Sequence, residues 1–151
     1  MRVKIKRLNE KAVIPFKSHD DDFCYDVVAT SCEEIAPNVY KYGTGIALQI
    51  ARDARYMAKR RDAILSIDAR PRSSVWKTGM LLSNCEGTID AGYTGEITAV
   101  FYHVMPNMPK YEVGDKIFQI CIGHTYKIAF EEVDELEATE RGEGGYGSTG
   151  K

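Results

Sequence analysis

The sequence predicts an all-β protein with one short helix. Apolar and charged residues alternate from Val3 to Lys6, which is the two-residue period of a strand with one buried face. Runs rich in β-branched and aromatic residues recur along the chain, and glycine, proline or aspartate separates one run from the next. Only two short segments, after Ile50 and after Pro71, are candidates for a helix.

Composition indicates a globular domain. The 151 residues are 44% hydrophobic and 28% charged, as is typical of one domain with a real core. A net charge of −2 and a pI of about 5.9 argue against stable binding to nucleic acid. We expect a cytoplasmic protein with no membrane association, since the sequence has neither an export signal nor an apolar run of membrane-spanning length.

The four cysteines do not have the pattern of a zinc site. Cys24, Cys32, Cys85 and Cys121 show no Cys-x-x-Cys spacing and no nearby histidine pair. We interpret them as buried thiols of a reducing compartment.

The first half of the chain is expected to hold short strands. Residues 12–15 suggest a brief extended piece that ends at the proline. Residues 39–50 suggest a strand, a turn at Gly43-Thr44-Gly45 and a second strand. The basic stretch 52–61 is interpreted as a short exposed helix or loop, and a solvated face is favoured there over a phosphate clamp.

Four aspartates lie before or at the start of the strand expected around Asp26. Residues 20–22 are consecutive aspartates, whose side chains point to alternate faces of an extended chain and cannot all bind one metal ion. A solvated acidic loop is therefore favoured. Asp26 stands between apolar residues, so it is either hydrogen-bonded structure or part of a site.

A strand at residues 63–69 leads into a candidate phosphate site at Arg70-Pro71-Arg72-Ser73-Ser74. The proline forces an extended approach, and a serine can cap the helical turn that Gly79 closes. Free N–H groups, a guanidinium and two hydroxyls suit a phosphate, although a serine cap without a ligand explains the same residues equally well. Gln119 is the polar residue of the apolar run 117–122 and must bond either a neighbouring loop or a ligand.

The glycine-rich stretch 84–97 predicts a tight hairpin that feeds a strand. Its turn carries one carboxylate, Asp90, and one aromatic ring, Tyr93. Bare backbone in such a hairpin can approach a flat base, and the carboxylate can act on a substrate held by the ring. An ordinary turn that merely uses aspartate and glycine is the alternative.

The C-terminal residues 140–151 form a second glycine-rich segment. Gly142, Gly144 and Gly147 match Gly-x-Gly-x-x-Gly, but no helix can follow them, and the P-loop pattern also lacks its last position. A mobile arm that folds over a nucleotide remains, with a disordered tail as the alternative.

Five motifs in this order resemble the trimeric deoxyuridine triphosphatase (dUTPase) family along nearly the whole chain. They are Tyr25-Asp26-Val27, Arg70 to Ser74, Gly87 to Gly95, Gly114 to Gln119 and Arg141 to Gly150. The resemblance implies a jelly-roll-like β-barrel at residues 1–140 and a mobile arm at 141–151. It also implies a homotrimer that exchanges strands and shares its active sites between subunits.

The resemblance further implies hydrolysis of dUTP to dUMP and pyrophosphate, which limits uracil in DNA and supplies dUMP for thymidylate synthesis. Asp90 would activate the water that attacks the α-phosphate, and Tyr93 would pack against the deoxyribose. Asp26 would reach a phosphate-bound Mg²⁺ through water. The implied substrate-binding residues are Arg72, Ser73, Ser74, Asn84, Gly87, Thr88, Ile89, Tyr93, Gln119, Arg141, Tyr146, Gly147, Ser148 and Thr149.

Three features depart from the family pattern. Tyr146 stands where phenylalanine is usual, Cys24 replaces a usual glycine, and the basic stretch 52–61 resembles an insertion. A deoxycytidine triphosphate deaminase is disfavoured because Thr98-Ala99-Val100 lacks the glutamate expected there. A nucleotide-binding regulatory module that has lost turnover is the other alternative.

Overall fold

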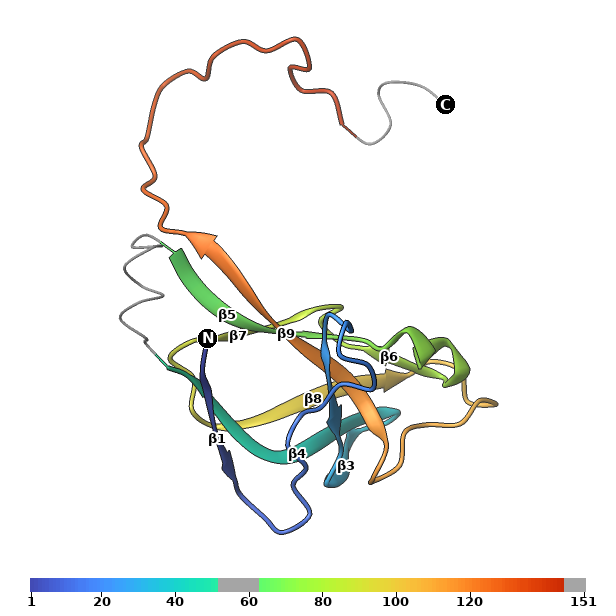
Figure 1. Cartoon of the computed structure of the whole chain (residues 1–151). Coiled ribbons are helices and arrows are strands. Elements are labelled where there is room, and N and C mark those ends of the chain that lie inside the picture. Colours follow the sequence, from blue (N-terminus) through green and yellow to red (C-terminus); the bar gives the residue numbers. More distant parts are fainter. Residues whose placement is uncertain (52–62, 146–151) are drawn as a thin grey trace.

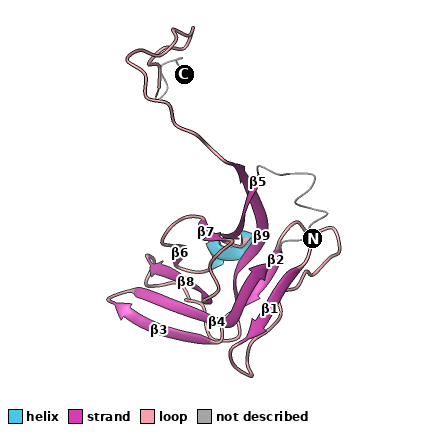
Figure 2. Cartoon of the chain, turned by 90° about the vertical axis from the view of Figure 1, so that its left-hand side faces the viewer, coloured by secondary structure: helices cyan, strands magenta, loops and turns pink. Residues whose placement is uncertain are grey.

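The computed structural model describes residues 1–51 and 63–145, which form two antiparallel β-sheets (Figures 1 and 2). One sheet has the order β1 (Val3–Arg7), β4 (Val39–Ile50), β8 (Glu96–His103) and β6 (Met80–Leu82), with β3 (Ser31–Ala36) also paired to β4. The other has the order β2 (Tyr25–Val28), β9 (Lys116–Tyr126), β5 (Ala63–Arg70) and β7 (Gly87–Asp90). The all-β, jelly-roll-like architecture is thus confirmed.

One hydrophobic core lies between the sheets. Tyr42 and Phe101 from the first sheet and Phe118 from the second are fully buried. The rings of Tyr42 and Phe101 meet edge to face, with centroids 5.8 Å apart. The Tyr42 hydroxyl donates to the carbonyl oxygen of Tyr111 at 2.8 Å, so this buried hydroxyl is satisfied.

Strand alternation gives the four-stranded sheet one apolar and one polar face. Leu65, Ile67 and Ala69 of β5 are buried in the core. Directly opposite residues of an antiparallel pair share a face, and the register pairs Asp68 with Thr88 on one side and with Cys121 on the other. The polar face also carries Ser66, Arg70, Asp90, Gln119 and Asp26. The implied chemistry therefore lies on one surface.

The turn expected within residues 39–50 is wrong, because β4 is one continuous strand of 12 residues. A β-bulge replaces the turn, since the register with β8 shifts between Gly43 and Ala47 and Gly45 adopts a φ of 66°. The Gly45 N–H donates to the carboxylate of Glu96 at 2.7 Å. A side chain of β8 thus accepts the N–H group freed at the bulge, and the chain does not reverse.

Two smaller expectations also need correction. Residues 12–15 form no strand, and only the adjacent Phe16 makes an isolated bridge, to Asp26. The helix after Pro71 is one 3₁₀ segment, η1 (Ser73–Lys77), whose N-cap is Arg72 and has no side-chain cap hydrogen bond. The expected serine cap is therefore wrong. The basic stretch 52–61 lies outside the described residues.

After β9 the chain leaves the two sheets as an extended segment, drawn in orange and red in Figure 1. No hydrogen-bonded helix or strand forms between residues 127 and 145. Within the described part of the chain, no helix has the length and apolar character needed to cross a membrane.

Candidate functional site

A polar cavity of about 400 Å³ opens where β2, β9 and the start of η1 meet. Its lining residues are Ser18, Asp22, Phe23, Cys24, Asp26, Arg72, Ser73 and Gln119. Four of them come from three of the motifs singled out in the sequence. Strand pairing places Asp26 opposite Gln119, and Gln119 opposite Arg70, so residues far apart in sequence converge here.

Asp26 is the electrostatic centre of this cavity. It is 9% exposed, and one carboxylate oxygen accepts from Arg72 Nε at 2.7 Å. The other oxygen lies 2.9 Å from Lys116 Nζ and 3.4 Å from Arg72 Nη2. Two cations thus surround one buried carboxylate. Asp22 also lines the cavity, so its formal charges balance, and the Arg72 guanidinium is the group of the lining that favours an anion.

The remaining polar groups hold this cluster in place. Arg72 Nη1 donates to the Ser74 hydroxyl at 3.1 Å. Gln119 Nε2 donates to the Pro71 carbonyl oxygen at 2.9 Å, so a neighbouring loop satisfies the polar group of this otherwise apolar strand. That bond uses one of the two amide N–H groups, and the Gln119 side chain also lines the cavity.

Lys116 was not recognised from the sequence as a site residue. Its ammonium contacts Asp26, lies 3.3 Å from the Ser18 hydroxyl and sits 4.6 Å from the centroid of the Phe16 ring. The sequence contains no local signal for this role, since the lysine follows a polar turn and the pairing of β2 with β9 alone brings it to Asp26.

A second pocket, of about 240 Å³, lies at the turn between β7 and β8. It is lined by Thr88, Ile89, Asp90, Tyr93, Glu96, Ile97 and Thr98. Asp90 is exposed, and its carbonyl oxygen accepts from the Tyr93 N–H at 2.9 Å. The Tyr93 hydroxyl donates to the Glu96 carbonyl oxygen at 3.0 Å, which fixes the ring beside the carboxylate.

The hairpin expected at residues 84–97 is wrong in one respect. β7 pairs with β5, whereas β8 pairs with β4 and β6, so the turn joins strands of different sheets. Asn84 still lies close to Gly87, since a Cβ built on that glycine would stand 3.2 Å from the Asn84 amide nitrogen. Asn84 and Gly87 are not among the residues that line the turn pocket.

The polar cavity and the turn pocket share no lining residue. Asp90 pairs with Ser66 in the middle of β5, whereas the cavity lies near Arg70 at the end of that strand, about 13 Å farther along. An ion-pair cluster fills the interval, in which Arg70 lies 2.5 Å from Glu86 and 3.7 Å from Asp68. The structure therefore does not bring Asp90 together with the phosphate candidates of its own chain.

Arg141, the one arm site residue among the described residues, lines neither pocket. Arg141 is exposed, and its Nε donates to the Gly144 carbonyl oxygen at 2.9 Å on the segment that leaves the sheets (Figure 1). Tyr146, Gly147, Ser148 and Thr149 lie outside the described residues.

The described residues contain no group of three or more His, Cys, Asp or Glu side chains that could hold a metal ion. Asp26 is the buried carboxylate of the cavity, and both its oxygens already face cations. This donor set fits a metal that is carried by a ligand's phosphates and contacts Asp26 through water. It does not fit direct coordination by the protein.

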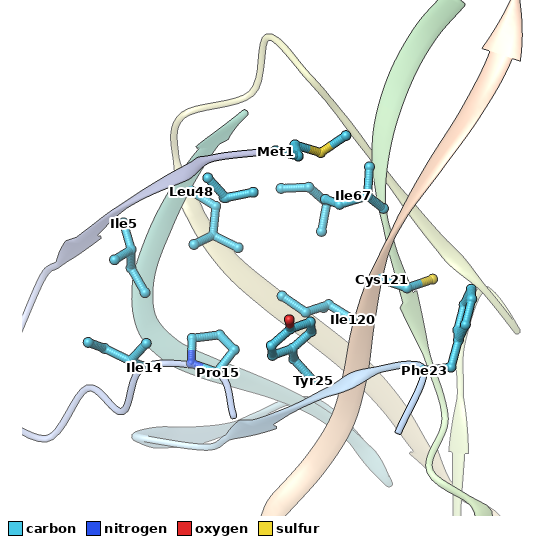
Figure 3. A pocket seen from close by; sticks show the side chains of 12 residues that line it. Met1, Ile5, Ile14, Pro15, Phe23, Tyr25, Leu48, Ile67, Ile120 and Cys121 are labelled. Atoms are coloured by element: carbon cyan, nitrogen blue, oxygen red, sulfur yellow. The ribbon is translucent and has the colours of Figure 1, made fainter. Parts of the chain in front are cut away.

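A third hollow, of about 480 Å³, is apolar (Figure 3). Side chains of β1, β4, β5 and β9 and of the segments before β2 point into it, among them Ile5, Leu48, Ile67, Ile120 and Phe23. Charged side chains are absent from its lining, so it is not a phosphate site.

Comparisons with known proteins match nearly the whole chain to one family. Residues 10–150 match the family model described as dUTPase. The deoxyuridine 5'-triphosphate nucleotidohydrolase of Clostridium novyi (strain NT) is 37% identical over 152 residues, which cover 99% of each chain. The protein of the same name from Crocosphaera subtropica is 35% identical, with the same coverage.

Solved structures show the same fold. A mutant dUTPase of Staphylococcus bacteriophage 80alpha with dUpNHpp superposes with a TM-score of 0.79 at 22% identity, covering 99% of both chains. A mutant dUTPase of the S. aureus phage phi11, described with a structural Mg(II) ion, gives a TM-score of 0.69 at 20% identity. The superposition covers 91% of this chain and 100% of the phage chain.

Proposed function

Because this chain belongs to the dUTPase family, we propose that it hydrolyses dUTP to dUMP and pyrophosphate. The observation that carries this proposal is the match over 99% of the chain to relatives named for that activity. The reaction limits uracil incorporation into DNA and supplies dUMP. Pyrophosphate release compared across the deoxynucleoside triphosphates tests it, since a deaminase or a regulatory module would release none from dUTP.

The two pockets divide the substrate between them. The polar cavity takes the phosphates, because Arg72, Ser73 and Ser74 supply a guanidinium and two hydroxyls at or beside its wall. The turn pocket takes the nucleoside, with the ring of Tyr93 against the deoxyribose. Asn84 and the backbone of Gly87, Thr88 and Ile89 read the uracil edge.

Asp90 acts as the general base toward water. It is an exposed carboxylate on the rim of the nucleoside pocket, where the α-phosphate of a bound nucleotide would begin. Positioning and charge neutralisation supply most of the catalysis in phosphoryl transfer, so the carboxylate needs only to orient the water and accept its proton. Asp26 contributes through water to the Mg²⁺ on the phosphates, whose charge that ion neutralises.

The complete site is assembled in a homotrimer. The separation of Asp90 from the phosphate cavity supports this, since one bound nucleotide of a single chain would have to span the Arg70–Glu86 pair. The segment after β9 also supports it, because Phe130 is 94% exposed and Leu136 is 89% exposed on an otherwise acidic stretch. Such side chains gain by packing on another subunit. The arm, with Arg141, Tyr146, Gly147, Ser148 and Thr149, then covers the nucleotide of a neighbouring site.

Mixed assembly tests the sharing of sites. The Asp90→Asn variant and a chain truncated after Glu140 are each inactive in this proposal, and they are refolded together in equal amounts. A site works when its Asp90 comes from the truncated chain and its arm from the Asp90→Asn chain. Random assembly makes these two independent choices of one half each, so about one quarter of wild-type activity returns. No recovery in mixed trimers verified by native gels would exclude shared sites.

A further inference from the structure

Cys24 and Cys121 face one another across two paired strands. β2 and β9 are antiparallel, and their register sets Tyr25 opposite Ile120 and Asp26 opposite Gln119. Cys24 immediately precedes β2, and continuing the register by one residue sets it opposite Cys121 of β9. Directly opposite side chains of an antiparallel pair lie on the same face, so the two thiols share the face that carries Asp26 and Gln119.

The backbone hydrogen bonds show which kind of pair the cysteines form. The N–H and C=O of Asp26 bond to Phe16, at 2.7 and 3.3 Å, and therefore point away from β9. The pair of Asp26 with Gln119 is thus of the non-hydrogen-bonded type. Because pair types alternate, the cysteine pair two residues away is of the same type, with Cα atoms about 4.5 Å apart. A disulfide accepts Cα separations of about 4.4–6.8 Å.

The surroundings give the two thiols different access. Cys24 is half-buried and lines the polar cavity beside Asp26, so a small reagent reaches it through that cavity. Cys121 is 7% exposed, and burial raises its pKa to about 11, with Cys24 as the next contributor. Figure 3 shows Cys121 beside Phe23, the residue that precedes Cys24.

The other two cysteines have no such partner in the described residues. Cys32 lies on β3 opposite Tyr42, and Cys85 lies in the turn before β7 with a φ of 57°. Both are exposed, so the expectation of buried thiols is wrong for them. They can react with thiol reagents on their own and are therefore removed in the test below.

We propose that Cys24, in the wall of the polar cavity, and Cys121, in the wall of the apolar hollow, form a thiol–disulfide exchange site between the two. A small-molecule disulfide such as oxidised glutathione is the oxidant. The Cys24 thiolate, its proton lost to water, attacks one glutathione sulfur, and the glutathione S–S bond breaks to release one glutathione thiolate. The Cys121 thiol then loses its proton to water and attacks the Cys24 sulfur, which releases the second glutathione. Two protein thiols are oxidised while one glutathione disulfide is reduced to two thiols.

The test uses the full chain with Cys32→Ser and Cys85→Ser, so that only the proposed pair remains. The reduced protein is incubated with oxidised glutathione, and remaining thiols are blocked with N-ethylmaleimide before intact-mass measurement and peptide mapping. We expect a loss of two hydrogens and a cross-linked peptide that joins Cys24 to Cys121. The bond closes a loop of roughly 100 residues, so the melting temperature rises by about 5–15 °C and dithiothreitol reverses the rise.

Further variants separate the possible outcomes. In the same background, Cys121→Ser stops at a glutathione adduct on Cys24, and Cys24→Ser forms no disulfide. Retention of both free thiols, or an adduct that never closes in the protein with both cysteines, would overturn the proposal.

A second oxidation experiment, in the presence of nucleotide, rests on the proposed phosphate role of the cavity. We expect dUpNHpp with Mg²⁺ to slow the oxidation several-fold, because the triphosphate occupies the route to Cys24. Equal rates with and without nucleotide would refute the phosphate role of the cavity, whereas disulfide formation without nucleotide tests the thiol pair alone.

Discussion

Replacement of Lys116 by methionine tests the charge balance of the polar cavity. Asp26 is 9% exposed, and the substitution leaves it with Arg72 as its one cation. At the observed 2.9 Å the gross attraction of the lost pair is about 6 kcal/mol for an effective dielectric constant of 20. The Lys116 side chain is 32% exposed, and its removal also spares its desolvation, so we expect a net loss of about 1–2 kcal/mol.

The same change is expected to weaken substrate binding more than turnover. Without Lys116, both donor edges of Arg72 are drawn to Asp26, and the guanidinium becomes less available to phosphate. A cost of about 1–2 kcal/mol corresponds to a rise in KM of about 5–30-fold, while kcat stays within about threefold. Lys116→Arg keeps a cation near Asp26 and should recover most of the loss.

Thermal unfolding and initial rates of pyrophosphate release measure both effects. A loss of about 1–2 kcal/mol lowers the melting temperature of a chain of this size by about 2–8 °C. Lys41→Met is the matched control, because Lys41 is exposed on β4 in the other sheet. A Lys116→Met protein that matches the Lys41→Met control in both melting temperature and KM would refute this account of the cavity.

Three other predictions follow from the structure and the proposed function. Asp90→Asn keeps the shape of the turn but removes the base, so turnover should fall by about 10²–10⁴ while dUpNHpp still binds in calorimetry; near-normal turnover would make Asp90 a turn residue only. Truncation after Glu140 should abolish activity without lowering the melting temperature, because the arm makes no core contact among the described residues; unfolding would instead show a structural arm. Stability should decline at alkaline pH, because burial raises the pKa of Cys121 to about 11 and also raises those of Tyr42 and Tyr111. The unfolded chain loses these protons first, so the stabilisation is complete below about pH 9 and is lost as the pH rises toward 11. Tyr42→Phe should make the decline of stability with pH shallower in denaturant titrations. Loss of the hydrogen bond to Tyr111 costs about 1 kcal/mol at pH 7. An unchanged dependence of stability on pH would show that Tyr42 does not contribute to the alkaline decline.

The strands could be predicted because their signal is local. Ile97, Ala99 and Phe101 point into the core while the residues between them face outward, as the alternation in the sequence indicates. Asp26 and Gln119 were likewise identifiable as polar residues within apolar runs, where burial demands a partner. The sequence could not say which partner each would find, because that depends on the register of β2, β9 and β5.

The errors arose where distant segments decide the local structure. Gly43-Thr44-Gly45 has the composition of a turn, but the Thr44 hydroxyl donates to the Ile97 carbonyl oxygen at 2.6 Å, and Glu96 accepts from the Gly45 N–H. These bonds from β8 keep β4 extended through a bulge. Similarly, the turn after Asp90 resembles a hairpin until the partner strands of β7 and β8 are known.

The position of Asp90 is what supports the proposal that a second subunit completes the site. On one chain, Asp90 and the cavity at Asp26 lie on the same sheet face but four residues apart along β5, with Arg70, Asp68 and Glu86 paired between them. Drawing the two together would require breaking β5 out of its ladder with β9, which pairs eight residues. A rigid sheet therefore cannot close on one nucleotide by bending. A second copy can instead supply the missing pocket by docking as a folded unit, without loss of any strand pairing.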